Sequence, residues 1–306
     1  MNILIYEDWN HFIPTGYSWA KGLLKNYHKV SHYNQSSIEL KNITDTNFDL
    51  IFLFDVPVWD EFKYQLDEFK NKSPHTKIIG VGFPHPKYFK FKDFIDGWIM
   101  NVYKYESATK IFNDMGYKSY NVSLASHKDL FFNRFDLPKK YDISFVGQLG
   151  IHGHGYKKED KYLYPFLDDD KYNCITYGFK YKNIKRTHIL YNEINDIYNL
   201  TKVNLNFHYS NQMAMDETDK IDFNGRVFDI ALSSNFQLVD HPYISKIFDS
   251  FKIIGNETNW KKLADYYIEH DEEAMSIAIK IKEEALKKHT WKHRMNDLIN
   301  NFIGKL

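Results

Sequence analysis

The stretch "FDLPKKYDISFVGQLG", residues 135–150, decides the fold of this chain. A proline and two lysines, residues 138–140, interrupt an alternation of strands and helices that has just been completed. The apolar run "YDISFVG", residues 141–147, then begins a new strand, and more strands and helices follow. An α/β pattern that restarts midway along 306 residues indicates two similar domains, at roughly 150 residues each.

The first half of the chain reads as a doubly wound α/β domain. Continuous apolar runs such as "FDLIFLFDV" (48–56) and "TKIIGVGF" (76–83) are typical of parallel strands that are buried on both faces. The segment 59–72 between them has the spacing of an amphipathic helix. Because the same alternation follows residue 138, the sequence predicts two Rossmann-like domains.

The bulk composition excludes several classes of protein. Lys+Arg and Asp+Glu both number 40, so no broad electropositive surface for nucleic acid is predicted. The single cysteine, Cys174, rules out an internal disulfide framework and a cysteine-rich metal site. The N-terminal segment lacks the features of a signal peptide, and no apolar run is long enough to span a membrane. We therefore expect a cytoplasmic protein without a membrane span.

The segment "NGRVFDIAL", residues 224–232, combines a cation and a carboxylate on one face of a predicted buried helix. Asn224 and Gly225 precede the helix, whose first amides offer an anion site that glycine leaves open. Arg226 presents a fork suited to phosphate oxygens, and Asp229 can accept hydrogen bonds from two vicinal hydroxyls. Together they fit the diphosphate and ribose of a sugar nucleotide. The alternative is a surface ion pair between Arg226 and Asp229.

Four segments carry a resemblance to the CgeB-like (spore-protein) glycosyltransferases, which have the GT-B fold. They are "NGRVFDIALSSNFQLVD" (224–240), "YDISFVGQ" (141–148), "IYNLTKVNLNFH" (197–208) and "HTWKHR" (289–294). The chain departs from the family pattern at Asp229, where a glutamate is usual, and at Ser233–Ser234, where a Cys-Gly turn is usual. The shorter carboxylate must lie closer to the ribose.

The resemblance implies a GT-B architecture with two Rossmann-like domains facing a cleft. Residues 1–137 would form the acceptor-binding domain, 138–288 the nucleotide-sugar-binding domain, and 289–306 a helix that crosses back to the first domain. The implied activity is transfer of a hexose from a nucleotide-diphosphate donor, UDP-linked by expectation, to a hydroxyl acceptor. Such enzymes commonly need no essential divalent metal or other cofactor. His289, Trp291 and Arg294 would help to dock the two halves.

Residues that follow the predicted strands of the second domain are the other candidates for donor binding. They are Gly147, Gln148, Tyr177 and Gly178. A tight turn would also explain Gly147, and a structural role is the preferred reading for Asn206 and His208. His152 and His154 in a glycine-rich loop could indicate a metal, but without a third ligand we prefer a mobile loop over the donor.

The acceptor side offers three candidates for a catalytic base. Asp8, Asp55 and His85 each follow a predicted strand of the first domain. An inverting enzyme needs such a base to activate the acceptor hydroxyl, whereas a retaining enzyme can use the donor phosphate. The residues do not decide between these two.

Three other functions compete with this interpretation. A phage-type glycosyltransferase acting on a modified DNA base would need a basic stripe, for which the candidates are Lys157, Lys158, Lys180, Lys182, Lys185 and Arg186. A non-catalytic protein that binds sugar nucleotides would show no turnover of the donor. A nucleotide-dependent oxidoreductase is disfavoured, because no G-x-G-x-x-G motif follows a predicted strand.

Overall fold

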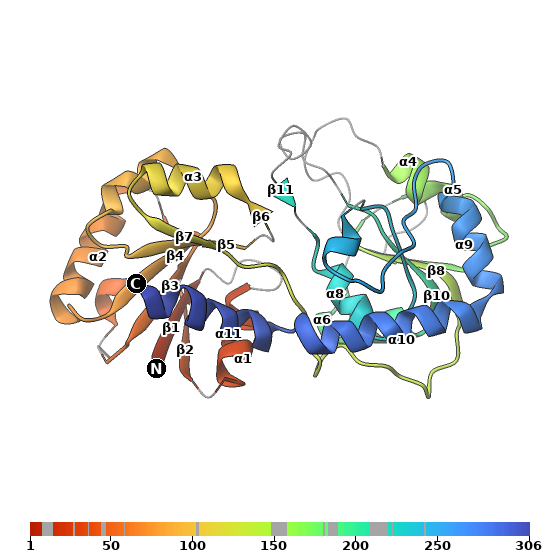
Figure 1. The fold of residues 1–306 in the computed structure, drawn as a ribbon, viewed down its shortest axis with the longest axis horizontal. Helices are drawn as coiled ribbons and strands as arrows, with labels where there is room; N and C mark the ends of the chain where they lie inside the picture. The colour runs from red at the N-terminus through yellow and green to blue at the C-terminus, as the bar shows by residue number, and fades with distance from the viewer. Residues whose placement is uncertain are drawn as a thin grey trace. The chain divides into compact units, whose positions relative to one another are not determined.

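The computed structural model divides the chain into two compact units (Figure 1). Unit 1 comprises Met1–Leu124, Asp219–Asp222 and Trp291–Leu306, and unit 2 comprises Ala125–Thr218 and Phe223–Thr290. The C-terminal helix therefore belongs to unit 1, and the predicted boundary after residue 137 lies inside unit 2. The residues that the structure describes are 1–7, 15–26, 28–35, 37–43, 47–57, 59–101, 104–147, 158–179, 181–182, 189–208, 220–221, 223–241 and 243–306.

Unit 1 contains a six-stranded parallel sheet in the order β2-β1-β3-β4-β5-β7. Its strands are β1 (Asn2–Glu7), β2 (Lys29–Asn34), β3 (Leu50–Phe54), β4 (Lys77–Val81), β5 (Gly97–Met100) and β7 (Lys118–Asn121). Every residue of β3 is buried, which confirms the reading of its continuous apolar run. A separate antiparallel pair joins β6 (Lys104–Tyr105) to β11 (Lys220–Ile221).

The helices of unit 1 include the amphipathic helix predicted at 59–72. They are α1 (Thr15–Leu24), α2 (Asp60–Lys72), α3 (Glu106–Asp114) and α11 (Trp291–Asn301), with 3-10 turns η1 (Leu40–Asn42), η2 (Pro86–Phe91) and η4 (Ile303–Lys305). In α2, acidic residues occupy the first turn and lysines the last, which complements the helix dipole. Its apolar face buries Phe62, Leu66 and Phe69.

The C-terminal helix α11 is held against α1 by close backbone contact. A Cβ on Gly22 would lie 2.6 Å from the carbonyl oxygen of Trp291, so only glycine permits this approach. Asn26 Nδ2 also donates a 2.9 Å hydrogen bond to the carbonyl of Lys292. The last helix is thus grouped with the first 124 residues of the chain in unit 1.

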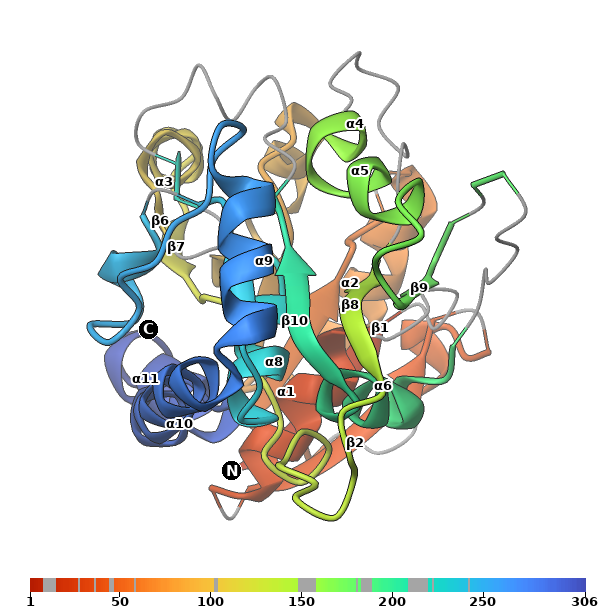
Figure 2. The same cartoon turned by 90° about the vertical axis from the view of Figure 1, so that its right-hand side faces the viewer.

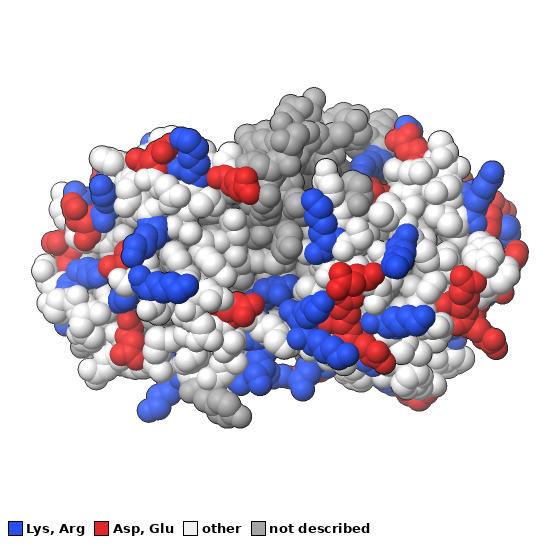
Figure 3. Space-filling view, in the orientation of Figure 1, with Lys and Arg blue, Asp and Glu red and all other residues white. Residues whose placement is uncertain are grey.

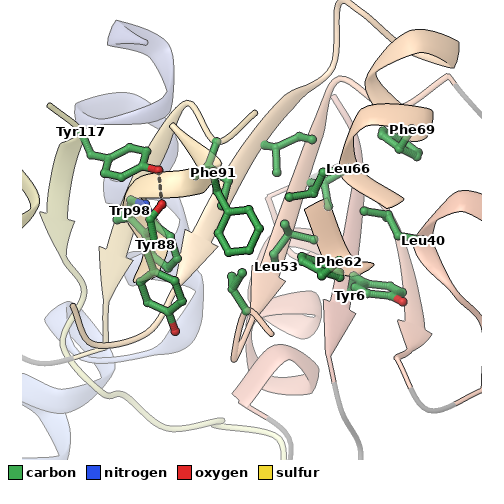
Figure 4. Close-up of a cluster of buried hydrophobic side chains, with 14 of the residues drawn as sticks. Tyr6, Leu40, Leu53, Phe62, Leu66, Phe69, Tyr88, Phe91, Trp98 and Tyr117 are labelled. Atoms are coloured by element: carbon green, nitrogen blue, oxygen red, sulfur yellow. Dashed lines mark hydrogen bonds between the residues drawn. The ribbon is translucent and has the colours of Figure 1, made fainter. Parts of the chain in front are cut away.

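The core of unit 1 is built around Trp98 (Figure 4). Its ring stacks on Tyr88 at 4.3 Å and on Phe112 at 5.0 Å between centroids. A Cβ on Gly80 of the neighbouring strand would lie 2.5 Å from the indole, which explains a glycine inside a buried strand. The Tyr117 hydroxyl donates to the carbonyl of Tyr88, so this buried polar group is satisfied.

Unit 2 contains a four-stranded parallel sheet in the order β12-β10-β8-β9. The strands are β8 (Tyr141–Val146), β9 (Cys174–Tyr177), β10 (Thr201–Asn206) and β12 (Gln237–Val239). Figure 2 shows β10 beside β8 in this sheet. Phe145 of β8 stacks on Phe207 at 4.7 Å, which packs the two strands where they end.

The helices of unit 2 connect and cover these strands. They are α4 (Glu159–Tyr162), α5 (Tyr164–Leu167), α6 (Tyr191–Asn199), α8 (Arg226–Leu232), α9 (Trp260–Glu269) and α10 (Asp271–Lys288), with the 3-10 turn η3 (Ile244–Lys246). All residues of α8 after Arg226 are buried, so this short helix lies inside the unit. In the described part of the chain, no helix is both long and apolar enough to cross a membrane.

Candidate functional site

The predicted donor-binding residues gather at one edge of the unit 2 sheet. Gly147 follows β8, Gly178 follows β9, Phe207 follows β10 and Asp240 follows β12. Because all four strands are parallel, these residues lie at the carboxyl edge of the sheet, where ligands of such sheets bind. The N-terminus of α8 reaches the same edge through Arg226.

Arg226 ties the ends of two strands together. Its Nη1 donates a 2.8 Å hydrogen bond to the carbonyl of Val146, and its Nη2 donates a 3.1 Å hydrogen bond to the carbonyl of Phe207. The guanidinium also lies over the ring of Phe145, 4.6 Å from its centroid. Arg226 thus brings a fixed positive charge to the sheet edge, and two of its N–H groups are committed to the protein itself. From the sequence we expected this fork to bind phosphate oxygens or to pair with Asp229, and its bonds to two strand carbonyls were not expected.

Gly147 is required by Arg226. A Cβ at this position would collide with Nη1 of Arg226, so a larger residue would displace the guanidinium. The sequence suggested a donor contact or a tight turn at Gly147, and neither of these accounts for the packing role. Gly178 differs, because its φ of 96° is the left-handed conformation that glycine adopts most readily.

The start of α8 offers fewer open amides than the sequence predicts. The amides of Val227, Phe228 and Asp229 already donate to carbonyl oxygens of Asn224 and Gly225. The helix has only seven residues, which limits its dipole. The electrostatic attraction for an anion at this edge therefore comes chiefly from the charge of Arg226. Gly225 has ordinary helical angles, and a Cβ there would meet only Oδ2 of Asp229, at 4.0 Å.

Asp229 is buried, and it is hydrogen-bonded to a residue of unit 2 that is far away in the sequence. Ser126 Oγ donates a 2.5 Å hydrogen bond to Oδ1 of Asp229. Burial raises the pKa of this carboxyl from 3.8 to about 7, and it outweighs the lowering effects of the Ser126 hydrogen bond and the Arg226 charge. Asp229 is therefore a carboxyl group that changes its charge near neutral pH, at the position where the sequence predicts a ribose contact.

A buried ion pair beside these residues was not foreseen from the sequence. Asp240 Oδ2 accepts a 2.5 Å hydrogen bond from Lys158 Nζ, which also donates to the carbonyl of His208 at 2.6 Å. Asp240 Oδ1 accepts a 2.9 Å hydrogen bond from the amide of His208 and lies 3.1 Å from its Nδ1. The signal was available, since His208 and Asp240 stand at the ends of the apolar segments that form the neighbouring strands β10 and β12.

The charges in this network are set by burial and by Lys158. Burial tends to raise the pKa of Asp240, but the contacts with His208 and Lys158 outweigh it and hold that pKa below its usual value. Burial lowers the pKa of His208 and, together with the charges of Arg226 and Lys158, outweighs the contact with Asp240, which raises it. The network is therefore a carboxylate and an ammonium paired with a neutral imidazole.

On unit 1, two of the three proposed bases lie at the corresponding edge of the sheet. Asp55 follows β3 and His85 follows β4, and these strands are neighbours. Asp55 is exposed and has a φ of 49°, an uncommon conformation for a residue other than glycine. His85 Nδ1 accepts a 3.2 Å hydrogen bond from the amide of Lys87. Asp8 lies outside the described residues.

The docking residues predicted near the C-terminus divide between the units. His289 belongs to unit 2, where its Nε2 lies 2.9 Å from the carbonyl of Ile247 and its ring packs on Phe248 and Phe228. Trp291 and Arg294 belong to unit 1.

Some of the remaining site predictions concern residues that the structure does not describe. Gln148, His152 and His154 are among these residues. Among the residues that the structure does describe, no group of three or more His, Cys, Asp or Glu side chains could hold a metal ion. Of the proposed basic stripe, Lys158 is paired with Asp240 and Lys182 with Asp168, and the other members are not described. On the face in Figure 3, acidic and basic side chains are interspersed on each unit.

Comparison with protein families gives a match over the second half of the chain. A family model described as "Glycosyl transferase-like" matches residues 137–300, more than half of the sequence. The chain belongs to the glycosyl transferase-like family. The match spans the sheet edge described above, including α8. The match does not distinguish the CgeB-like group within this family. Curated protein sequences give no match.

Solved structures show that this glycosyl transferase-like protein has the GT-B fold. Sucrose-phosphate synthase (tll1590) from Thermosynechococcus elongatus superposes with a TM-score of 0.62 at 7% identity, covering 100% of this chain and 99% of that one. Anabaena Alr3699/HepE, solved in complex with UDP and glucose, superposes with a TM-score of 0.55 at 10% identity, covering 100% of both chains. The fold prediction, two parallel-sheet α/β domains of GT-B type, is thereby confirmed.

Proposed function

We propose that this protein is a hexosyltransferase that moves a sugar from a UDP-linked donor to a hydroxyl group of an acceptor. The observation that carries the proposal is the family match over residues 137–300, because it includes the sheet edge that holds Arg226, Asp229 and the His208 network. The similarity of fold to HepE, solved with UDP and glucose, supports the choice of UDP and of a hexose.

The electrostatics of unit 2 support transfer without an essential divalent metal. Departure of the nucleotide leaves negative charge on its diphosphate, and a fixed positive group near that charge lowers the barrier. Arg226 is such a group, because its bonds to Val146 and Phe207 hold the guanidinium at the sheet edge. In this proposal Asp229 accepts hydrogen bonds from the ribose hydroxyls in its ionised form.

The acceptor hydroxyl would be activated from unit 1. Asp55 and His85 follow neighbouring strands, and a carboxylate or imidazole at such a position can take the proton as the hydroxyl attacks. Asp55 is the better candidate of the two. Its side chain is exposed, and its positive φ is a strained backbone conformation of the kind that is concentrated at active sites. Asp8 remains a third candidate.

A thermal-shift screen tests the donor assignment. UDP-, GDP-, ADP- and dTDP-linked hexoses are added separately at saturating concentration, and only the UDP-linked compounds are expected to raise the melting temperature by several degrees. Release of UDP is then followed with candidate hydroxyl acceptors. A shift with another nucleotide would make the UDP assignment wrong, and no shift with any of them would contradict the proposal. Binding without any turnover would favour the non-catalytic alternative.

A further inference from the structure

Two buried hydrogen-bond acceptors without partners lie where β10 ends. Nε2 of His208 and Oδ1 of Asn206 are shielded from solvent and have no hydrogen-bond partner among the described residues. The His208 side chain is 9% exposed, and Asn206 is completely buried. Since buried polar atoms are almost always hydrogen-bonded in folded proteins, this pair indicates that another molecule supplies the missing donors.

The orientation of the Asn206 amide is fixed by its neighbours. Gln237 Nε2 donates a 2.9 Å hydrogen bond to the carbonyl of Val227, so Oε1 of the same side chain must act as an acceptor. That oxygen receives a 2.9 Å hydrogen bond from Nδ2 of Asn206. The other end of the Asn206 amide is therefore its oxygen, which can only accept.

The tautomer of His208 is fixed in the same way. Its Nδ1 lies 3.1 Å from the Asp240 carboxylate, and a lone pair at Nδ1 would face the negative oxygen. Nδ1 of a neutral imidazole must therefore carry the proton, which leaves a lone pair on Nε2. The ion pair of Asp240 with Lys158 keeps that carboxylate in place. Nε2 is thus a second atom that can only accept.

Both acceptors lie on the side of the sheet edge that α8 covers. Asn206 is the last residue of β10, and the ring of His208, two residues later, lies 6.0 Å from that of Phe223, which precedes α8. The link from Asn206 through Gln237 to Val227 shows that α8 packs against that face. Arg226 binds the carbonyl of Phe207, the residue between them. A further buried oxygen without a partner, Oδ1 of Asn224, directly precedes α8.

This arrangement determines the chemistry of the group that it can bind. Phosphate oxygens accept hydrogen bonds and would meet two more acceptors here. A uracil imide offers a single N–H donor. Neighbouring hydroxyl groups of a sugar offer several donors and carry no charge, so they complement a pair of acceptors best.

We infer that His208, with Asn206 behind it, accepts hydrogen bonds from sugar hydroxyls of the bound nucleotide sugar and so contributes to donor selection. The inference rests on the proposed function, because it assumes that a nucleotide sugar occupies this edge. The hydroxyls belong either to the ribose or to the transferred hexose, and the two sources are separated by comparing UDP with UDP-glucose.

Isothermal calorimetry with UDP-glucose and with UDP tests this role in three proteins. In H208N the amide N–H can replace Nδ1–H toward Asp240, but no atom occupies the position of Nε2. In H208Q the longer side chain can place its amide oxygen near that position. H208N should bind UDP-glucose about fivefold or more weakly, and H208Q should stay within about twofold of the wild type. A loss for UDP-glucose alone assigns the contact to the hexose, and an equal loss for UDP assigns it to the ribose.

The outcomes separate this inference from the proposed function. If the wild type binds UDP-glucose and H208N binds both ligands equally well, the role of His208 is refuted and the donor assignment stands. If the wild type binds neither ligand, both fail together. Nitrogen-15 NMR of the wild-type imidazole gives a readout that needs no variant to fold. An unprotonated Nε2 is expected without ligand, and a proton on Nε2 would refute the inference.

Discussion

Ser126 Oγ donates a 2.5 Å hydrogen bond to Oδ1 of Asp229, across 103 positions of sequence. Ser126 also pairs with Thr290 in a parallel bridge, and its amide donates to the carbonyl of His289. Ser126 and Thr290 lie beside two of the points where the chain passes from one unit to the other, after Leu124 and before Trp291. The carboxyl group proposed to bind ribose is thus held by a serine that is itself bonded to another segment of unit 2.

The raised pKa of Asp229 predicts a specific dependence of stability on pH. Because its pKa is about 7 in the folded state and 3.8 ordinarily, the unfolded chain loses this proton first as pH rises. The protonated group makes its full contribution to the free energy of unfolding below pH ~4. This contribution, on the order of 4 kcal/mol, is lost progressively as the pH rises to ~7. Asp229→Asn cannot ionise, and its amide oxygen can still accept from Ser126. The variant should melt at a higher temperature than the wild type at pH 8.

Melting temperatures of both proteins at pH 5 and pH 8 check this prediction. At pH 5 the two should be similar, because the wild-type carboxyl is still protonated in the folded state. A difference between the proteins that is the same at both pH values would show that Asp229 does not titrate in this range.

The same titration should appear in the binding of UDP-glucose, whose diphosphate keeps its charge between pH 6 and pH 8. If Asp229 accepts two hydroxyl protons from ribose, its ionised form binds better, so wild-type affinity should rise between pH 6 and pH 8. Asp229→Asn should show weaker binding with little change over this range. Calorimetric titrations at the two pH values measure the effect, and equal pH profiles for the two proteins would remove Asp229 from the ribose site.

The alternation of strands and helices was predictable. The spacing of apolar residues within a short segment indicates which of its faces is buried, and this spacing is visible in the sequence. The run at 48–56 became β3, and the amphipathic segment at 59–72 became α2. The restart at residue 141 became β8, the first strand of the second sheet. These features depend on residues that are close together in sequence.

The helix that carries Arg226 and Asp229 was predictable, but the contacts of these two residues were not. Arg226 and Asp229 are three residues apart, which suggested a shared face, yet their partners are Val146, Phe207 and Ser126. These partners are distant in sequence, and the spacing of apolar residues gives no information about such contacts. For the same reason the sequence could not show that Gly147 makes room for Arg226.

Arg226 is predicted to stabilise the fold of unit 2 and also to strengthen the binding of the donor. Replacing it with alanine removes two hydrogen bonds from a charged donor and leaves the carbonyls of Val146 and Phe207 without it, at a cost of about 3 kcal/mol. UDP-glucose should also bind more than about tenfold more weakly, since the charge is lost. Arg226→Lys keeps the charge but cannot bridge both carbonyls, so it should recover binding more than stability. Denaturation and calorimetry measure the two effects, and unchanged affinity in Arg226→Ala would refute the phosphate role.

Two glycines at this edge should respond in opposite ways to alanine. Gly147→Ala places a Cβ against Nη1 of Arg226, and the resulting displacement should cost about 1–3 kcal/mol. Gly225→Ala meets only a carboxylate oxygen at 4.0 Å and has helical angles, so stability should be unchanged or raised by about 0.5 kcal/mol. Urea denaturation of the two variants gives both values. Equal stability of the two would show that Arg226 is not held against Gly147.

Asp55 should affect transfer without affecting donor binding. It lies on unit 1 at the end of β3, whereas the residues proposed to bind the donor lie on unit 2. Asp55→Asn keeps the size of the side chain but removes the base, so the transfer rate should fall about 10²- to 10⁴-fold while UDP affinity stays at the wild-type value. Asp60→Asn is the matched control, because Asp60 is an exposed aspartate of the same unit that pairs with Lys90. His85→Ala should reduce the rate less than Asp55→Asn. A wild-type rate in Asp55→Asn together with a large loss in His85→Ala would transfer the role of base to His85.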